Sequence, residues 1–180
     1  MLQDIKMETR QIHGILSRIV VPPTRFIGVF AKDQIPITDS LPHYPACFVA
    51  NTHASNKKGE HWVAFWIDSS KHCEFFDSYG LSPLIYGFNV PFTFFNTMTI
   101  QSLNSSVCGQ FCIYYLYCRS RGLPLAHILN SFSISNLEWN DYQVARFVNK
   151  HFGIFTSNHG SHFSCYQSCG PRVSCSCLSG

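Results

Sequence analysis

The chain has 180 residues, which is enough for one domain with a buried core. Hydrophobic residues make up 46% of it and charged residues only 13%, which excludes a chain that is disordered over most of its length. The formal net charge of +3 permits weak attraction to nucleic acid, but no long lysine and arginine run indicates a dedicated nucleic-acid binder.

The first half of the chain is predicted to form one amphipathic helix followed by short strands. Four apolar side chains recur at helical spacing: Ile12, Ile15, Leu16 and Ile19. Residues 46–51 are short, apolar and followed by a polar loop, which predicts a buried strand. Residues 61–68 and 71–77 are rich in Val, Phe and Trp and are separated by Ser69–Ser70, so they predict a hairpin.

The second half is predicted to be mainly helical. Residues 92–101 have high strand propensity and are expected to bring Gln101 to the edge of the sheet. Residues 107–121 are apolar on nearly every side, which predicts a buried and central helix. A shorter helix is expected over residues 125–132.

The last helix and the tail after it differ sharply in composition. The helix is expected to begin at a capping box formed by Ser135 and Glu138 and to end near Gly153. Residues 156–180 are rich in Ser, Gly, Cys and His and have no periodicity, so we expect a disordered tail outside a folded domain of residues 1–155. The cysteine and histidine spacings in the tail match no standard metal-binding finger, so no metal site is predicted.

The nine cysteines are expected to be mostly free thiols. Residues 1–14 are polar and mixed in charge, unlike a signal peptide, and no stretch approaches the roughly 20 apolar residues of a membrane span. We therefore expect a protein that is neither secreted nor membrane-bound, a setting in which a disulfide scaffold is disfavoured.

Cys108 is the candidate nucleophile. It precedes Gly109 at the expected start of the 107–121 helix, where unpaired N–H groups and the helix dipole favour a thiolate. The alternative for a cysteine in an apolar helix is a small buried hydrophobic residue, and we keep that interpretation for Cys112 and Cys118.

His61 and Asp77 are the candidate base and the group that orients it. His61 opens the first hairpin strand, and Trp62 beside it could form a wall of the site. Asp77 ends the second strand, so the hairpin would bring it next to His61. Glu74 is a competing acid, but its alternation with Phe75 indicates that it faces solvent.

Acyl transfer also needs hydrogen-bond donors for the negative oxygen that develops in the transition state. The backbone N–H of Cys108 can be one such donor. Gln101, seven residues before it, could supply its side-chain amide as another. Each assignment is weak alone, but the order of base, acid, amide and thiol followed by an apolar helix is moderately specific.

These residues and their surroundings resemble a known family. Four segments carry most of the resemblance: FVANTH (48–53), GEHWVAFWID (59–68), FFDSYGLS (75–82) and QSLNSSVCGQFCIYYL (101–116). The chain resembles the adenovirus-type cysteine endopeptidases (adenain), in the clan that also contains the SUMO-specific proteases. The resemblance includes versions of these enzymes carried by virus-like Maverick/Polinton DNA transposons, and it covers most of the chain before the tail.

The resemblance implies an α+β fold of the papain-like type in a circularly rearranged form, with a mixed sheet packed against the helix of the nucleophile. It implies Cys108 as nucleophile, His61 as general base and then acid, Asp77 as orienting group and Gln101 as oxyanion donor. Adenovirus members commonly carry Glu where this chain has Asp77, and either carboxylate can fix the imidazole tautomer. Three further residues are expected to contact the substrate: Asn51, Trp62 and Gly109.

The resemblance also implies a substrate and a setting. The expected substrates are capsid or core precursor proteins of a virus or virus-like element, cut after small residues in Gly-Gly or Gly-x-Gly sites. The expected enzyme is a monomer in the virion or the host nucleus. Two alternatives stay open: a deconjugase of ubiquitin-like proteins that uses the same site, and an inactive relative that acts as a binding module.

No cofactor is expected to be required for the chemistry, but activators are known in the family. Adenovirus proteases form a disulfide with a short viral peptide through a cysteine upstream of the glutamine. Residues 92–100 contain no cysteine, so only noncovalent addition of a peptide is expected here. DNA is the other activator that the resemblance implies, and the scattered basic residues of the chain support it weakly.

Overall fold

The computed structural model describes residues 6–69 and 72–153, so the tail predicted over 156–180 lies outside the described residues. The elements in chain order are α1 (Thr9–Ile19), β1 (Arg25–Phe30), the 3₁₀ turn η1 (Lys32–Gln34), β2 (Ala46–Asn51), β3 (Trp62–Ser69), β4 (His72–Phe76), β5 (Phe94–Phe95), α2 (Cys108–Arg119), α3 (Leu125–Leu129) and α4 (Leu137–Phe152). Within the described ranges, no helix is both long and apolar enough to cross a membrane.

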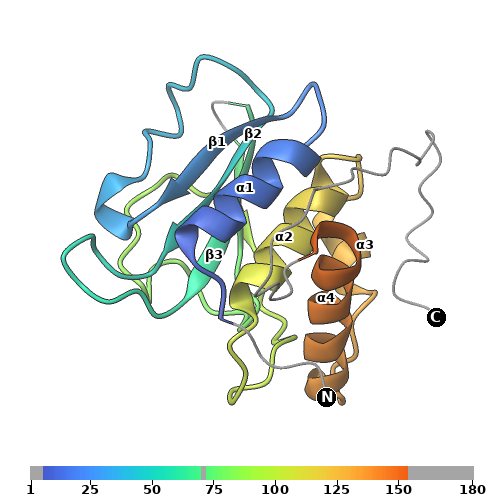
Figure 1. Ribbon diagram of the computed structural model, residues 1–180. Coiled ribbons are helices and arrows are strands. Elements are labelled where there is room, and N and C mark those ends of the chain that lie inside the picture. The colour runs from blue at the N-terminus through green and yellow to red at the C-terminus, as the bar shows by residue number, and fades with distance from the viewer. Residues whose placement is uncertain (1–5, 70–71, 154–180) are drawn as a thin grey trace, which may run out of the picture.

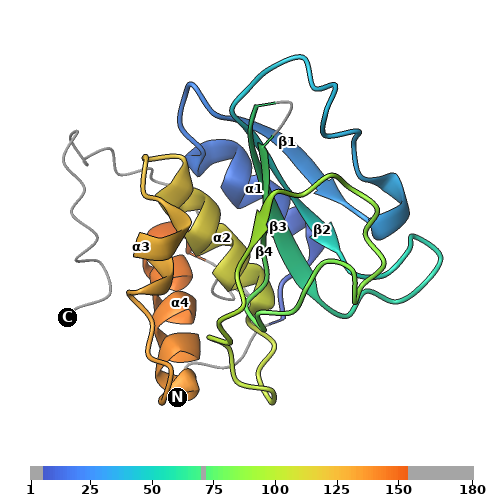
Figure 2. The same ribbon diagram turned by 180° about the vertical axis from the view of Figure 1, so that it is seen from behind.

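A single mixed sheet organises the molecule, with strand order β1-β2-β3-β4-β5. The outer pairs β1–β2 and β4–β5 are parallel, and the inner pairs β2–β3 and β3–β4 are antiparallel. The helices lie on one face of this sheet, and long connecting loops cover the other (Figures 1 and 2). This arrangement confirms the predicted α+β class with a helix packed on a mixed sheet.

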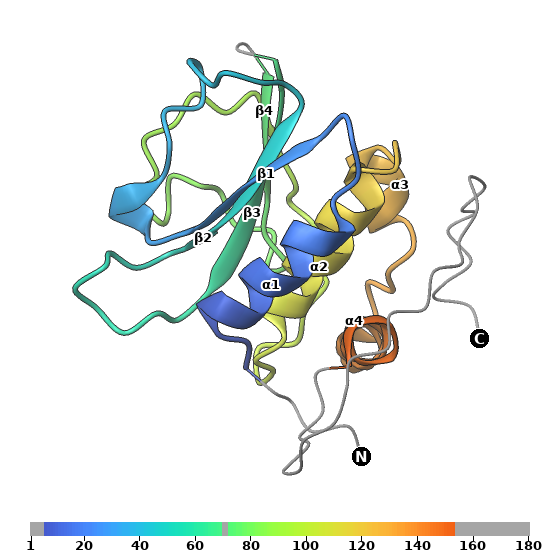
Figure 3. The same ribbon diagram turned by 45° about the horizontal axis from the view of Figure 1, so that its top comes forward.

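The two faces of the sheet have separate hydrophobic cores. In the edge-on view, α1 and α2 lie against one face while loops lie over the other (Figure 3). Alternate residues of β3 divide between the cores, as the pleat of a strand requires. Trp62, Ala64 and Trp66 join the helical core, whereas Val63, Phe65 and Ile67 join the core under the loops. The start of β3, the end of β4 and the start of α2 contribute Trp62, Phe76 and Cys108 to this same helical core.

Most predicted elements are confirmed, and the exceptions have local causes. The amphipathic helix forms as α1, the hairpin as β3 and β4, and the buried helix as α2. The strand predicted over 92–101 is wrong, because only Phe94–Phe95 pairs with β4. Thr93 and Asn96 on either side bond to the backbone through their side chains, which replaces a continuous ladder.

Two helix ends also differ from the prediction. The capping box at Ser135 is wrong, because α4 starts one residue later with Asn136 as N-cap, whose side chain accepts a bond from the N–H of Trp139 at 3.0 Å. The helix expected over 125–132 ends at Leu129 as α3. The predicted end near Gly153 is confirmed, since this residue has φ +59° in a left-handed C-cap.

Glu74 does not face solvent, contrary to the prediction from strand alternation. It is 6% exposed on β4, points toward α2 and accepts hydrogen bonds from Tyr115 and Arg119, the latter at 2.8 Å. The guanidinium of Arg119 also lies 4.7 Å from the centre of the Trp66 ring. Glu74 is therefore an internal link between the sheet and α2, and it is not the acid of the candidate site.

Replacing Glu74 with alanine is expected to lower the free energy of unfolding by about 3 kcal/mol. The change leaves the Arg119 cation and the buried Tyr115 hydroxyl without their shared acceptor. Urea unfolding followed by tryptophan fluorescence measures the loss. Asp68→Ala is the matched control, because Asp68 pairs with His72 at 2.9 Å with both side chains at least 40% exposed. That pair should contribute less than about 1 kcal/mol, and equal losses for the two variants would contradict the prediction.

Candidate active site

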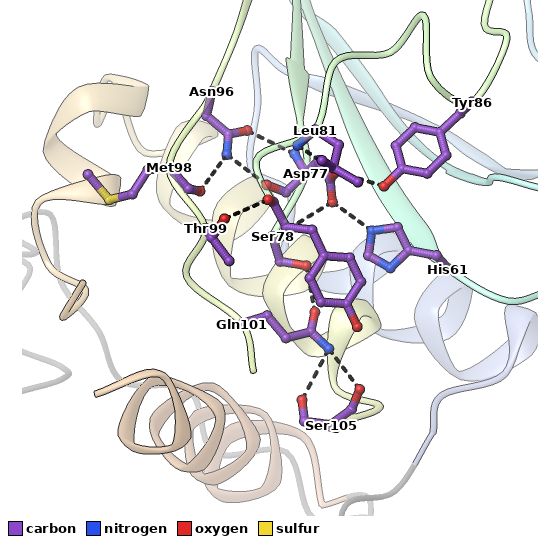
Figure 4. Close-up of polar contacts among 11 residues, drawn as sticks. His61, Asp77, Ser78, Leu81, Tyr86, Asn96, Met98, Thr99, Gln101 and Ser105 are labelled. Carbon is purple, nitrogen blue, oxygen red and sulfur yellow. Dashed lines mark hydrogen bonds and ion pairs between the residues drawn. The ribbon is translucent and has the colours of Figure 1, made fainter. Parts of the chain in front are cut away.

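The hairpin brings His61 and Asp77 into direct contact. His61 is the residue before β3 and Asp77 is the residue after β4, so antiparallel pairing sets them side by side. Nε2 of His61 lies 2.6 Å from Oδ1 of Asp77 (Figure 4). This contact fixes one ring nitrogen on the carboxylate and leaves Nδ1 free to face a thiol.

The Asp77 carboxylate is held by four donors and is fully buried. Its Oδ1 accepts from His61 and from the Tyr79 N–H at 3.0 Å, and its Oδ2 accepts from the Leu81 N–H at 3.0 Å and the Tyr86 hydroxyl at 2.9 Å. Two donors on each oxygen leave the carboxylate little freedom to rotate. The His61 ring also stacks on Tyr79, with ring centres 4.6 Å apart.

Two buried polar residues that the sequence did not reveal, Asn96 and Ser78, hold the backbone at and after Asp77. The Asn96 side chain accepts from the N–H of Asp77 at 2.9 Å and donates to its carbonyl at 2.7 Å, so it pairs with the backbone as a strand would. Ser78 accepts backbone bonds from Ile100 and Gln101. Both residues lie in segments without a repeating pattern, so sequence periodicity gives no signal for them.

Cys108 is the first residue of α2, and it opens onto a small cavity. The N-cap residue Val107 makes no side-chain capping bond, so the helix end keeps backbone N–H groups for a ligand. The cavity measures about 240 Å³. Its lining consists of Lys6, Glu60, His61, Tyr79, Ser105, Ser106 and Cys108. The thiol and the imidazole therefore line the same small, partly open cavity.

The environment of His61 favours its protonated form. Burial disfavours a charge on the ring and lowers its pKa, but the hydrogen bonds to Asp77 and Cys108 and the charges on both partners outweigh this effect. The net result raises the pKa of His61 to about 9. The His61 imidazolium is thus favoured around neutral pH, and it lies in the same cavity as the Cys108 thiol.

The side chain of Gln101 is held at both of its polar atoms. It is fully buried, and its Oε1 accepts from the Ser78 hydroxyl at 2.6 Å. Its Nε2 lies 3.1 Å from both the carbonyl oxygen and the hydroxyl oxygen of Ser105, as Figure 4 shows. Gln101 does not sit on a sheet edge as predicted, because Ser78 rather than a strand neighbour holds its backbone N–H.

The three residues expected to contact substrate occupy different surroundings. Asn51 and Trp62 line a larger open cavity of about 770 Å³, which shares Lys6 with the cavity of Cys108. Gly109 faces the N-terminal segment instead, because a side-chain β-carbon there would lie 3.0 Å from Cβ of Met7. Substrate contact by these residues stays a prediction.

The other cysteines within residues 6–69 and 72–153 are buried free thiols. Burial raises the pKa of Cys47, Cys73 and Cys112, which keeps these thiols protonated near neutral pH. Among the described residues, no cluster of His, Cys, Asp or Glu could hold a metal ion. The tail residues weighed as metal ligands lie outside the described part.

Comparison with known proteins identifies viral proteases. No protein-family model matches the chain. The protease of bovine adenovirus 2 is 25% identical over 169 residues, covering 74% of this chain and 78% of the relative. The protease of human adenovirus B serotype 3 is 26% identical over 170 residues, covering 74% and 77%.

A solved structure supports the fold. The crystal structure of an ASFV protease superposes with a TM-score of 0.55 at 16% identity, and the match covers 79% of this chain and 67% of the other. Two independent comparisons, one of sequence over most of the chain and one of shape, thus agree with the resemblance stated from the motifs. The chain is a cysteine endopeptidase related to the adenovirus proteases.

Proposed function

We propose that the chain cleaves precursor proteins of a virus or virus-like element after small residues, at Gly-Gly or Gly-x-Gly sites. The observation that carries the proposal is the buried contact of His61 with Asp77 on one side and the Cys108 thiol on the other. A thiol paired in this way with an oriented imidazole is the arrangement that acyl transfer requires.

The proposed reaction needs only groups of the protein and one water molecule. His61 takes the thiol proton, and the Cys108 thiolate attacks the carbonyl carbon of the scissile bond. His61 then protonates the departing amine as the C–N bond breaks, which leaves a thioester on Cys108. A water molecule, deprotonated by His61, attacks the thioester and releases the carboxylic acid and the free thiol.

The negative oxygen of the two tetrahedral intermediates would bind the Cys108 N–H and one amide hydrogen of Gln101. For this, the substrate oxygen would replace the Ser105 hydroxyl as the acceptor of that hydrogen. Gln101→Ala is expected to lower kcat by about 100-fold, with a smaller change in KM, because the lost bond forms mainly in the transition state. Steady-state kinetics on a fluorogenic peptide measure this, and an unchanged kcat would contradict the assignment.

The small volume beside Cys108 supports cleavage after small residues. Matched fluorogenic peptides ending in Gly-Gly, Ala-Gly and Leu-Leu before the fluorophore would test this preference. The Gly-Gly peptide is expected to be cleaved fastest by at least about tenfold, since an added methylene group is worth about 1–3 kcal/mol in a fitted pocket. Cleavage of a ubiquitin-like fusion but of none of the peptides would favour the deconjugase instead.

Location in the virion or host nucleus, a monomeric state and activation by DNA or a noncovalent peptide belong to the same proposal. The basic surface available to DNA is smaller than the sequence indicates, because Arg119 bonds to Glu74 and Arg121 bonds to backbone carbonyls of Ile19 and Tyr117. Adding DNA of defined length to the peptide assay at low and high salt tests the DNA part.

A further inference from the structure

Helix α4 holds the chain on both sides of Gln101. The side-chain amide of Asn140 donates to the carbonyl of Ile100 at 3.0 Å, just before Gln101. The carboxylate of Asp141 accepts from the Ser102 hydroxyl at 2.6 Å and from the Ser102 N–H at 3.3 Å, just after it. Two consecutive residues of one helix thus hold both neighbours of the proposed oxyanion donor.

The two holding residues are themselves fixed. Asn140 is 1% exposed, and it also bonds to the N–H and the carbonyl of Ser133. Asp141 is 7% exposed and follows it on the same helix turn. Because α4 packs on α2, a rigid element connects the helix of Cys108 to the segment that carries Gln101.

The segment after Gln101 is irregular and depends on individual hydrogen bonds for its position. Residues 101–107 belong to no helix or strand. A cavity of about 280 Å³ separates part of this segment from α4, and its lining includes Ser102, Ser105 and Asp141. Close packing therefore does not fill the space between them, and the hydrogen bonds of Ser102 to Asp141 bridge it.

We propose that Asp141 is a positioning residue for Gln101, a role that rests on the oxyanion function proposed for Gln101. The carboxylate fixes Ser102, and Ser102 fixes the start of the segment in which Ser105 contacts the Gln101 amide. Oxyanion stabilisation depends on donors that are already in place when the negative oxygen forms. Loss of this anchor displaces the Gln101 amide and reduces stabilisation of the transition state. The reactivity of the Cys108 thiol does not change.

The test compares peptide hydrolysis with alkylation of Cys108 by iodoacetamide. Alkylation needs the thiolate but forms no tetrahedral oxyanion, so it reports on Cys108 and His61 alone. Asp141→Ala is expected to lower kcat by about tenfold, with KM within about threefold and the alkylation rate within about twofold of wild type. The double variant with Gln101→Ala should be no slower than Gln101→Ala alone, because the two residues act on one interaction.

Two further variants keep the test decisive. Glu138→Ala removes a carboxylate from the same helix and the same cavity, and it should leave kcat unchanged. Ser102→Ala removes the partner hydroxyl and should reproduce a kcat loss of several-fold even where Asp141→Ala fails to fold.

Three results would overturn the proposal. These are an unchanged kcat in both Asp141→Ala and Ser102→Ala, a parallel loss of alkylation, and multiplicative losses in the double variant. If Gln101→Ala itself leaves kcat unchanged, the oxyanion role fails first and the Asp141 role fails with it. A kcat loss in Gln101→Ala that Asp141→Ala and Ser102→Ala do not share removes only the Asp141 role.

Discussion

Cys108→Ala is expected to lower kcat/KM for peptide hydrolysis by at least about 10⁴-fold, to the background of the assay. Without the sulfur, no covalent intermediate forms, and the remaining donors can only orient a water molecule poorly. Purified wild type and variant, assayed with the Gly-Gly peptide at equal concentration and with mass spectrometry of the products, give the ratio directly.

Cys112→Ala is the control, because it shows how much activity is lost when a thiol that takes no part in the chemistry is removed. Cys112 lies one turn along α2 from Cys108, is 1% exposed, and its pKa is raised well above the ordinary value by burial. Its removal should leave kcat/KM within about threefold of wild type and cost about 1 kcal/mol of stability through a small cavity. Turnover by Cys108→Ala within tenfold of wild type, in the folded protein, would remove Cys108 from the mechanism.

Asp77→Asn is expected to lower kcat/KM by about 10²- to 10⁴-fold at neutral pH. It should also move the alkaline limb of the pH–activity profile to lower pH. The folded-state pKa of His61 is raised from 6.5 to about 9, so the imidazolium is retained below that pH and lost as the pH rises through it. Wild-type activity should therefore fall near pH 9. Removing the Asp77 charge should shift that limb down by about one pH unit or more.

The Asp77 variant must be compared with one that keeps the charge. Asp77→Glu retains a carboxylate beside His61, so the alkaline limb of its pH profile should stay near pH 9. Some activity is expected to be lost, because the extra methylene must fit a fully buried site with four donors. A pH profile from pH 5 to 10, with folding checked by circular dichroism, measures both limbs. An alkaline limb that does not move in Asp77→Asn would exclude Asp77 as the group that raises the pKa of His61.

The parts of the site that lie on regular elements could be predicted from sequence. The alternating runs on both sides of Ser69–Ser70 predict a hairpin, and a hairpin brings the start of its first strand near the end of its second, where His61 and Asp77 make contact. The apolar run after Cys108 predicts a buried helix, so the position of the thiol at a helix start followed from the same pattern. Periodicity was sufficient here because repeated backbone bonds define each element.

The parts that lie on irregular chain could not be predicted in the same way. Gln101 was expected at the end of a strand, but that segment is held by single side-chain bonds from Ser78 and Asn96. Glu74 was expected to face solvent because it alternates with Phe75 along the strand, but its partner Arg119, 45 residues away, holds it inside. A hydrogen bond between two isolated polar residues that are far apart in the chain produces no periodic pattern in the sequence.

The segment before α1 has a consequence for the order in which the protein folds. The carbonyl of Met7 accepts the indole N–H of Trp62, 55 residues later, at 3.1 Å, and the Met7 side chain packs on the helix turn at Gly109. Closing such long loops costs entropy that only the completed contacts repay. Both contacts of Met7 are therefore expected to form only after the sheet and α2 have come together, so the N-terminal side of the larger cavity, which Met7 and Trp62 line, depends on the rest of the fold.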